Sequence, residues 1–225
     1  MSAAARHVVA FGGFDGERAL RDYVLELTDA ARPRVAFLGT AVGDADLAVR
    51  NFYENFPSSR CEPFHVRLFG VPDRPNERLR EADAIYVSGG NTANMLAVWR
   101  VHGVDDALRD AWERGVVLTG SSAGAICWFE VGVTDSFGAE LDPIDDCLGF
   151  LPGSMCPHYD GEERRRPVFT RLVSEGQLPP GLAADDDVGL RFSGSELVDV
   201  VTTRADAAAY RVGVDGEERV SARVL

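Results

Sequence analysis

A serine flanked by glycines is the feature of this sequence that most clearly suggests chemistry. Gly120-Ser121-Ser122-Ala123-Gly124 follows the apolar run Gly115–Thr119 and precedes Ala125–Phe129, where most residues favour a helix. A strand, a Gly-x-Ser-x-Gly turn and a helix make up a nucleophile elbow, whose sharp turn exposes the serine hydroxyl at the edge of a sheet. The glycines permit the backbone angles and close approaches that the turn requires. The pattern predicts Ser122 as a nucleophile; the alternative is a glycine-rich turn with two solvated serines.

A serine nucleophile in acyl transfer also needs two hydrogen-bond donors for the developing oxyanion. The N–H of Ala123, directly after the nucleophile, is one candidate. The turn Ser88-Gly89-Gly90-Asn91 is the other, because its glycines let the backbone approach a substrate closely. The helix that follows the elbow is expected to add free N–H groups and the positive end of its dipole.

The general base is sought among four histidines. His7 and His65 lie within expected strands, and His102 follows an expected helix. His158 lies in Cys156-Pro157-His158-Tyr159-Asp160, where a short strand leads into a loop. Loops at strand ends hold side chains over clefts, so His158 is the predicted base, and a surface loop histidine is the alternative.

Several carboxylates could orient that base. Asp135 lies shortly after the elbow, whereas Asp185-Asp186-Asp187 lies at a turn between apolar segments. Three adjacent carboxylates also suggest a metal site, but consecutive side chains point in different directions and no His or Cys cluster accompanies them. We therefore expect neither a metal nor another cofactor, and the residues alone leave the choice of carboxylate open.

Strands and helices alternate through the first half of the chain, which predicts an α/β fold with a mostly parallel sheet flanked by helices. Several strands end in glycine-containing turns, and ligands bind at the carboxyl edge of such sheets, so these turns are expected to converge on one cleft. The expected strands are His7–Phe11, Arg34–Leu38, Pro63–Phe69, Asp83–Val87 and Val116–Leu118, and the expected helices are Glu17–Ala30, Asp44–Phe56, Thr92–Arg100 and Val104–Arg114.

The last third of the chain has a different pattern. Glu162–Glu175 is expected to be helical, and Gly181–Phe192, Glu196–Thr203 and Ala207–Val212 are expected to contain short strands. These strands predict a small antiparallel C-terminal meander packed on the main sheet. No linker or convincing repeat interrupts the sequence, and its length suits a single catalytic domain over residues 1–225.

Composition limits the partners and the location. The 36 acidic residues exceed the 23 Lys and Arg and give a net charge of −13, which repels phosphate backbones and anionic membranes. We therefore expect neither nucleic acid nor a membrane as a partner. Residues 1–6 lack the apolar core of a signal peptide and no apolar run could span a bilayer, so a cytoplasmic location is expected. The four cysteines form no Cys-x-x-Cys pair and are expected to be reduced.

Three short motifs occur in an order that resembles a known family. Ser88-Gly89-Gly90-Asn91-Thr92, the elbow and Pro157-His158-Tyr159 together resemble the peptidase E (aspartyl dipeptidase) family of serine peptidases, which is related to the cyanophycinases. The similarity runs from about the first strand to the last third of the chain. It implies a three-layer sandwich like that of class I glutamine amidotransferases. It also implies Ser122 as nucleophile, His158 as base and the N–H groups of Gly90 and Ala123 as oxyanion donors.

The resemblance places the triad acid in a turn after the histidine, where the family commonly has Glu. The matching turn is Ala184–Asp187, with Asp186 as the best match and Asp185 as its rival. Asp135 matches another family position near the site, where it would support the site or bind substrate.

Further substrate contacts are expected from Asn91 and from Arg165. The run Arg164-Arg165-Arg166 follows His158 closely enough to supply a cation for a substrate with an N-terminal Asp. The alternative is that these arginines form the solvated start of a helix.

The favoured function is a serine exopeptidase of the dipeptidase E type, which hydrolyses short peptides through an acyl-enzyme. A cyanophycinase-like or esterase-type serine hydrolase and a non-catalytic binding protein with the same cleft are the alternatives. An α/β-hydrolase esterase has its acid between Ser and His, where Asp135 lies, but the Gly-Gly-Asn turn and the lack of a long cap argue against it. The expected partners are a short peptide substrate and a second copy of the chain in a homodimer.

Overall fold

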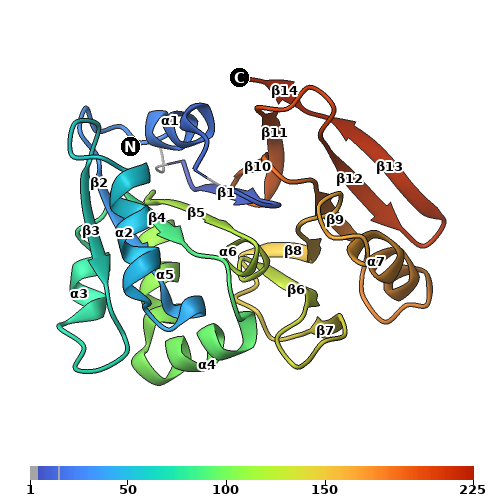
Figure 1. Ribbon diagram of the computed structural model, residues 1–225, viewed down its shortest axis with the longest axis horizontal. Helices are drawn as coiled ribbons and strands as arrows, with labels where there is room; N and C mark the ends of the chain where they lie inside the picture. The colour runs from blue at the N-terminus through green and yellow to red at the C-terminus, as the bar shows by residue number, and fades with distance from the viewer. Residues whose placement is uncertain (1–4, 15) are drawn as a thin grey trace.

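Two mixed sheets lie against each other in the computed structural model, which describes residues 5–14 and 16–225. Within these residues, one sheet has eight strands in the order β14-β11-β10-β1-β5-β4-β2-β3, and the other has six in the order β13-β12-β9-β8-β6-β7. Figure 1 shows the first sheet beside α1 and α2, and the second sheet between it and α7. Most of the N-terminal segment considered above as a signal peptide lies outside the described residues.

The first sheet has a parallel centre and an antiparallel edge. Strands β1, β5, β4, β2 and β3 run parallel, as the alternation of strands and helices predicts, and β10 joins β1 antiparallel. The α/β fold with a largely parallel sheet is thereby confirmed. The strands of this sheet are β1 (His7–Phe11), β2 (Arg34–Leu38), β3 (Glu62–Val66), β4 (Ala84–Val87), β5 (Val117–Ser121), β10 (Val188–Ser193), β11 (Glu196–Thr202) and β14 (Arg223–Val224).

The second sheet was only partly expected. Its strands β9 and β12 lie in the region predicted to form a meander, and β13 follows that region and was not predicted. Strands β10 and β11 pair with the first sheet instead, so the C-terminal strands are divided between the two sheets. The strands of this sheet are β6 (Phe129–Thr134), β7 (Asp142–Ile144), β8 (Leu151–Cys156), β9 (Gly181–Ala184), β12 (Ala208–Gly213) and β13 (Gly216–Ser221).

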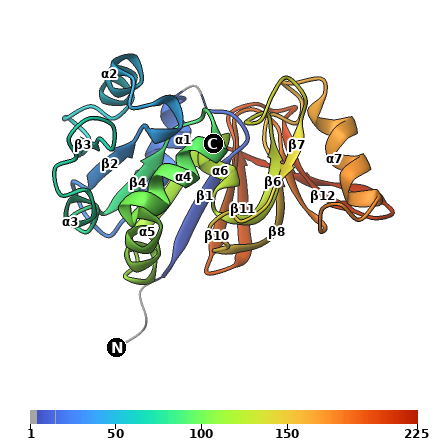
Figure 2. The ribbon, with the colours of Figure 1, turned by 90° about the horizontal axis from the view of Figure 1, so that it is seen from below.

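Helices α1 and α2 pack on one face of the first sheet, α4 and α5 pack on its other face, and α7 packs on the second sheet (Figures 1 and 2).

Local signals set the bounds of the two central helices. Asn91 caps α4 by accepting a 2.8 Å hydrogen bond from the N–H of Asn94, and Gly103, with φ of 64°, ends α4 and begins α5. The helices are α1 (Arg18–Glu26), α2 (Asp46–Asn55), α3 (Pro75–Leu79), α4 (Thr92–His102), α5 (Val104–Glu113), α6 (Ala123–Ile126) and α7 (Arg165–Ser174), and a 3₁₀ turn, η1, spans Thr40–Val42.

Among the described residues, buried apolar side chains join these layers in three clusters. The cluster on one face of the first sheet includes Phe11 of β1 and Phe52 of α2. On the other face, a larger cluster joins that sheet to α4, α5 and the second sheet, and it includes Leu108 and Met155. The third cluster packs Phe169 and other residues of α7 against the second sheet. The second sheet is therefore fixed between the first sheet and α7.

The apolar face of α5 provides a test of this packing. Leu108 is fully buried, so Leu108→Ala is expected to lower the free energy of unfolding by about 2–5 kcal/mol in urea denaturation. Val101 at the end of α4 is 81% exposed, so Val101→Ala is the matched control and should change that free energy by less than about 0.5 kcal/mol. Equal losses in the two variants would contradict the burial of α5 against the sheet.

Candidate functional site

Ser122 occupies the sharp turn between β5 and α6. Its backbone has φ of 56° and ψ of −112°, a conformation that residues with a side chain rarely adopt. A Cβ placed on Gly124 would overlap the carbonyl of Val87, and one placed on Gly120 would overlap the carbonyl of Gly124. Both glycines of the Gly-x-Ser-x-Gly pattern are thus required by close backbone packing, and the turn has the shape of a nucleophile elbow.

The helix after the elbow is much shorter than the sequence suggests. α6 is a single turn of four residues, because the alternating apolar residues from Phe129 onward continue as strand β6. The carbonyl of Ser122 accepts the N–H groups of Ala125 at 2.8 Å and of Ile126 at 2.9 Å. The N–H of Ala123 donates to no protein acceptor within the described part of the chain.

The glycine turn after β4 lies directly beside the serine. A Cβ placed on Gly89 would lie 3.2 Å from the Cβ of Ser122. Gly90 has φ of 130°, and a Cβ there would overlap the carbonyl of Ala41, so glycine is required. In residues 5–14 and 16–225 the Gly90 N–H, like that of Ala123, has no protein acceptor. The N–H groups of Gly90 and Ala123, in the two turns that meet at Ser122, are therefore available as donors.

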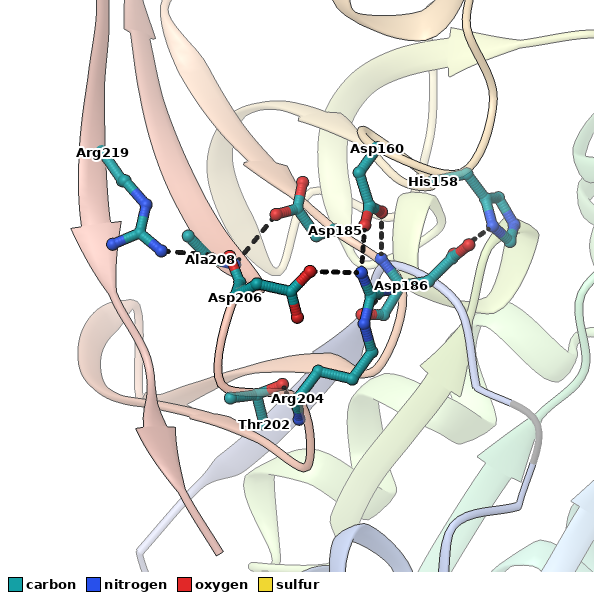
Figure 3. Close-up of polar contacts among 9 residues, drawn as sticks. All are labelled: His158, Asp160, Asp185, Asp186, Thr202, Arg204, Asp206, Ala208 and Arg219. Atoms are coloured by element: carbon teal, nitrogen blue, oxygen red, sulfur yellow. Dashed lines mark hydrogen bonds and ion pairs between the residues drawn. The ribbon is translucent and has the colours of Figure 1, made fainter.

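The turn between β9 and β10 brings a carboxylate to His158 (Figure 3). With its proton on Nδ1, His158 donates a 2.7 Å hydrogen bond to Oδ1 of Asp186, which leaves Nε2 as an acceptor. The two side chains are 23% and 34% exposed, so both are accessible to solvent. His158 also has a positive φ of 52°. A histidine and a carboxylate are thus paired here, as a base and its orienting acid are in a catalytic triad.

The end of β1 links this pair to the serine. The carbonyl of Phe11 accepts the N–H of Ser122 at 3.2 Å. Two residues later, a Cβ placed on Gly13 would overlap the carboxylate of Asp186 and lie 3.0 Å from Nδ1 of His158. Two residues of extended chain span at most roughly 7 Å, so all three candidate residues lie around one strand end.

Asp185, Asp187 and Asp135 lie in surroundings that differ from those of Asp186. Asp185 is 4% exposed, and its Oδ2 accepts the N–H of Ala208 at 2.9 Å. This burial raises the pKa of Asp185 to about 6, because the charged form is poorly solvated there. Asp187 has a positive φ of 59° and donates its N–H to the carbonyl of Gly13 at 3.0 Å. Asp135 is exposed, at the end of β6.

The side chains expected to contact substrate are largely engaged within the protein. The amide of Asn91 caps α4 and also donates to the carbonyl of Ser136 at 3.0 Å, which ties the glycine turn to the segment after β6. Arg165 is 3% exposed, and its guanidinium donates to Glu162 at 2.7 Å and to the carbonyl of Val133 at 2.9 Å. In this structure both side chains therefore hydrogen-bond to other segments of the protein and hold those segments in place.

The arginines on either side of Arg165 are also paired. Arg164 contacts Glu140, and Arg166 pairs with Glu217 while lying over the ring of Tyr159. Within the described residues, none of these three arginines is therefore without an acidic partner. The run does form the start of α7, but Arg165 is buried and not solvated as that alternative expects.

Two polar residues next to the pair of His158 and Asp186 were not singled out from the sequence. Asp160 accepts the backbone N–H of Asp186 at 2.8 Å and the guanidinium of Arg204 at 2.8 Å. Asp160 lies two residues after the predicted base, which is a local signal that sequence reasoning could have used. Arg204 lies 44 residues further along the chain, and its sequence context gives no such signal.

The described residues contain no group of three or more His, Cys, Asp or Glu that could hold a metal ion. Within the same residues, no helix has the length and apolar character needed to cross a membrane. The four cysteines are free thiols, three of them buried.

Comparison with known proteins assigns this arrangement to a family. Residues 8–200 match the model of peptidase family S51. The chain belongs to peptidase family S51. This S51 peptidase is 47% identical over 205 residues to the uncharacterized peptidase YgaJ of Bacillus subtilis strain 168, and the match covers 89% of this chain and 88% of that protein. It is also 34% identical over 197 residues to peptidase E of Streptomyces coelicolor, with 84% and 79% covered. The family membership confirms the resemblance and establishes the chain as a serine peptidase.

The fold is likewise similar to that of a solved peptidase. The crystal structure of a peptidase from an acI-B1 Actinobacterium superimposes with a TM-score of 0.73 at 17% identity, and the match covers 99% of this chain and 96% of that one. The two-sheet architecture of this S51 peptidase is therefore that of a known peptidase fold.

The buried carboxyl of Asp185 predicts a distinctive pH dependence. Its pKa of about 6 in the folded state exceeds the ordinary value of 3.8, so the folded protein binds the proton more tightly than the unfolded chain. This contribution is fully present below about pH 4 and is lost as the pH rises through 6, with a total on the order of 3 kcal/mol. Asp185→Asn keeps an oxygen for the Ala208 N–H and removes the titration. Urea unfolding at pH 4 and pH 7 should show the variant gaining stability relative to wild type at the higher pH, whereas a constant difference would contradict the burial of the charge.

Proposed function

We propose that this S51 peptidase hydrolyses short peptides as an exopeptidase of the dipeptidase type, with Ser122 as nucleophile, His158 as general base and Asp186 as the orienting acid. The observation that carries the proposal is the 2.7 Å hydrogen bond between His158 and Asp186 at the strand end that also binds the N–H of Ser122. The names of relatives support the substrate class, since they include peptidase E and a probable α-aspartyl dipeptidase of Drosophila melanogaster.

In the proposed reaction, Oγ of Ser122 attacks the carbonyl carbon of the scissile bond. Nε2 of His158 takes the hydroxyl proton, while Asp186 stabilises the resulting imidazolium through Nδ1. The carbonyl oxygen becomes an oxyanion and accepts hydrogen bonds from the N–H groups of Gly90 and Ala123. The C–N bond then breaks as His158 returns the proton to the leaving amine. His158 then takes a proton from a water molecule, whose oxygen attacks the acyl carbon. The ester C–O bond to Ser122 breaks, the carboxyl product leaves, and His158 returns the proton to Oγ of Ser122.

The exopeptidase assignment gives a role to Asp135. This exposed carboxylate precedes Ser136, whose carbonyl accepts a hydrogen bond from Asn91 in the glycine turn. This contact joins the segment after β6, to which Asp135 belongs, to the glycine turn that contains Gly90. A carboxylate in this segment is suited to the free ammonium group of a peptide N-terminus, a group that an exopeptidase acting at that end recognises.

The nucleophile can be tested with a reagent that reacts with activated serines whatever their peptide substrate. A labelled fluorophosphonate should modify wild type at Ser122, and Ser122→Ala should lose both this labelling and, by several orders of magnitude, the turnover of a dipeptide library followed by mass spectrometry. Ser121→Ala is the matched control, because Ser121 is buried in β5 and should retain activity. Labelling that persists in Ser122→Ala would contradict Ser122 as the nucleophile, and an unreactive wild type would favour the non-catalytic alternative.

The role of Asp135 can be separated from the chemistry. Asp135→Asn should raise KM for dipeptides roughly tenfold with little change in kcat, because the lost attraction to the ammonium acts equally on substrate and transition state. N-acetylated peptides, which lack that charge, are the control, and their turnover should not respond to the substitution. A fall in kcat with unchanged KM would instead place Asp135 in the catalytic step.

A further inference from the structure

A closed ring of hydrogen bonds surrounds the backbone of Asp186 (Figure 3). Oδ1 of Asp160 accepts the N–H of Asp186 at 2.8 Å, and Oδ2 of the same carboxylate accepts Nη2 of Arg204 at 2.8 Å. Nη1 of Arg204 reaches the carbonyl of Asp186 at 3.4 Å and completes the ring. Both peptide groups of the candidate acid are thus held by one ion pair.

The carboxylate of Asp186 depends on such support. Among the described residues, it accepts a side-chain hydrogen bond only from His158. It occupies a narrow space, since a Cβ placed on either Gly13 or Gly161 would overlap it. A small rotation of the backbone of Asp186 would therefore move the carboxylate away from Nδ1 of His158 or into one of these glycines.

Asp160 also belongs to the segment that carries the base. It lies two residues after His158, and the carbonyl of His158 accepts the N–H of Glu162 at 3.0 Å, so the segment forms a compact turn. One side chain thereby joins the turn of the base to the turn of the acid. The positive charge of Arg204 stabilises this arrangement, because without it the negative charge of Asp160 would lie beside Asp186 with no cation to neutralise it.

We propose that Asp160 and Arg204 act together as positioning residues that hold Asp186 at hydrogen-bond distance from His158. This inference rests on the proposed function, in which Asp186 orients the base. Neither residue touches the substrate or the serine in this proposal. Their effect on catalysis passes through the backbone of Asp186, and a displacement of about 1 Å at a catalytic group can cost roughly 100-fold in rate.

The test compares Asp160→Ala, Asp160→Asn, Arg204→Met and Arg204→Lys with wild type. The control is Asp206→Ala, because Asp206 also contacts Arg204, at 3.4 Å, but in the described part of the chain it forms no hydrogen bond with Asp186. Three quantities are measured: the fluorophosphonate labelling rate at saturation, the concentration that gives half that rate, and the NMR signal of the proton on Nδ1 of His158. Thermal unfolding shows which variants are folded.

We expect Asp160→Ala and Arg204→Met to lower the saturating labelling rate roughly 10- to 100-fold with the half-saturating concentration within about twofold. The hydrogen-bonded Nδ1 proton signal should broaden or move upfield in the same variants. Asp160→Asn, which keeps an oxygen for the Asp186 N–H, and Arg204→Lys, which keeps the charge, should lose less than about tenfold. If the Ala or Met variant does not fold, these two conservative variants provide the comparison through the same signals.

A wild-type proton signal and labelling rate in folded Asp160→Ala or Arg204→Met would overturn the proposal. An equal loss in Asp206→Ala would also overturn it, because the effect would then be general to the loop. The NMR signal separates this inference from the proposed function. If wild type neither reacts with the fluorophosphonate nor cleaves peptides, the proposed function fails, while the response of the His158 proton still tests the positioning pair.

Discussion

The contact between the two sheets at the end of β1 is the constraint on which the site depends. Ser122 extends from β5 in the first sheet, and His158 follows β8 in the second. Asp186 lies where the chain crosses from β9 in the second sheet to β10 in the first. A Cβ placed on Gly12 would overlap the carbonyls of Ala184 and Asp185, so the sheets meet here with backbone against backbone. A relative movement of the two sheets would therefore change the distance between His158 and Asp186.

Much of the first sheet could be predicted because its signals are local. Each of β1, β2, β4 and β5 is a short apolar run that ends in a glycine or a serine turn, and the intervening helices have apolar residues at helical spacing. The second sheet was harder to predict. Its strands β7 and β8 contain Pro143 and Pro152, which weaken a strand pattern, and the division of β10 and β11 from β12 and β13 depends on partners far away in the sequence.

The residues of the candidate site also differ in whether a local sequence pattern predicts them. The serine and its glycines follow from one local pattern, and the histidine from its place at a strand end. Sequence reasoning preferred Asp186 over Asp185 through a family resemblance, and in the structure Asp186 contacts His158 while Asp185 is buried against Ala208. Arg165 was expected to offer a cation to a substrate because it follows His158 closely in the sequence, yet Glu162 and a backbone carbonyl allow its burial. Such pairings require three-dimensional information.

The brevity of α6 has a consequence for how the elbow stabilises charge. A helix of four residues has too few aligned peptide groups to build an appreciable macrodipole. The negative charge that develops at a bound carbonyl would therefore be stabilised by individual N–H groups at contact distance. Such contacts depend steeply on geometry and little on ionic strength, so the glycine turn and the strained serine backbone must be held rigidly. The electrostatics of this elbow are consequently local, and they are set by backbone shape.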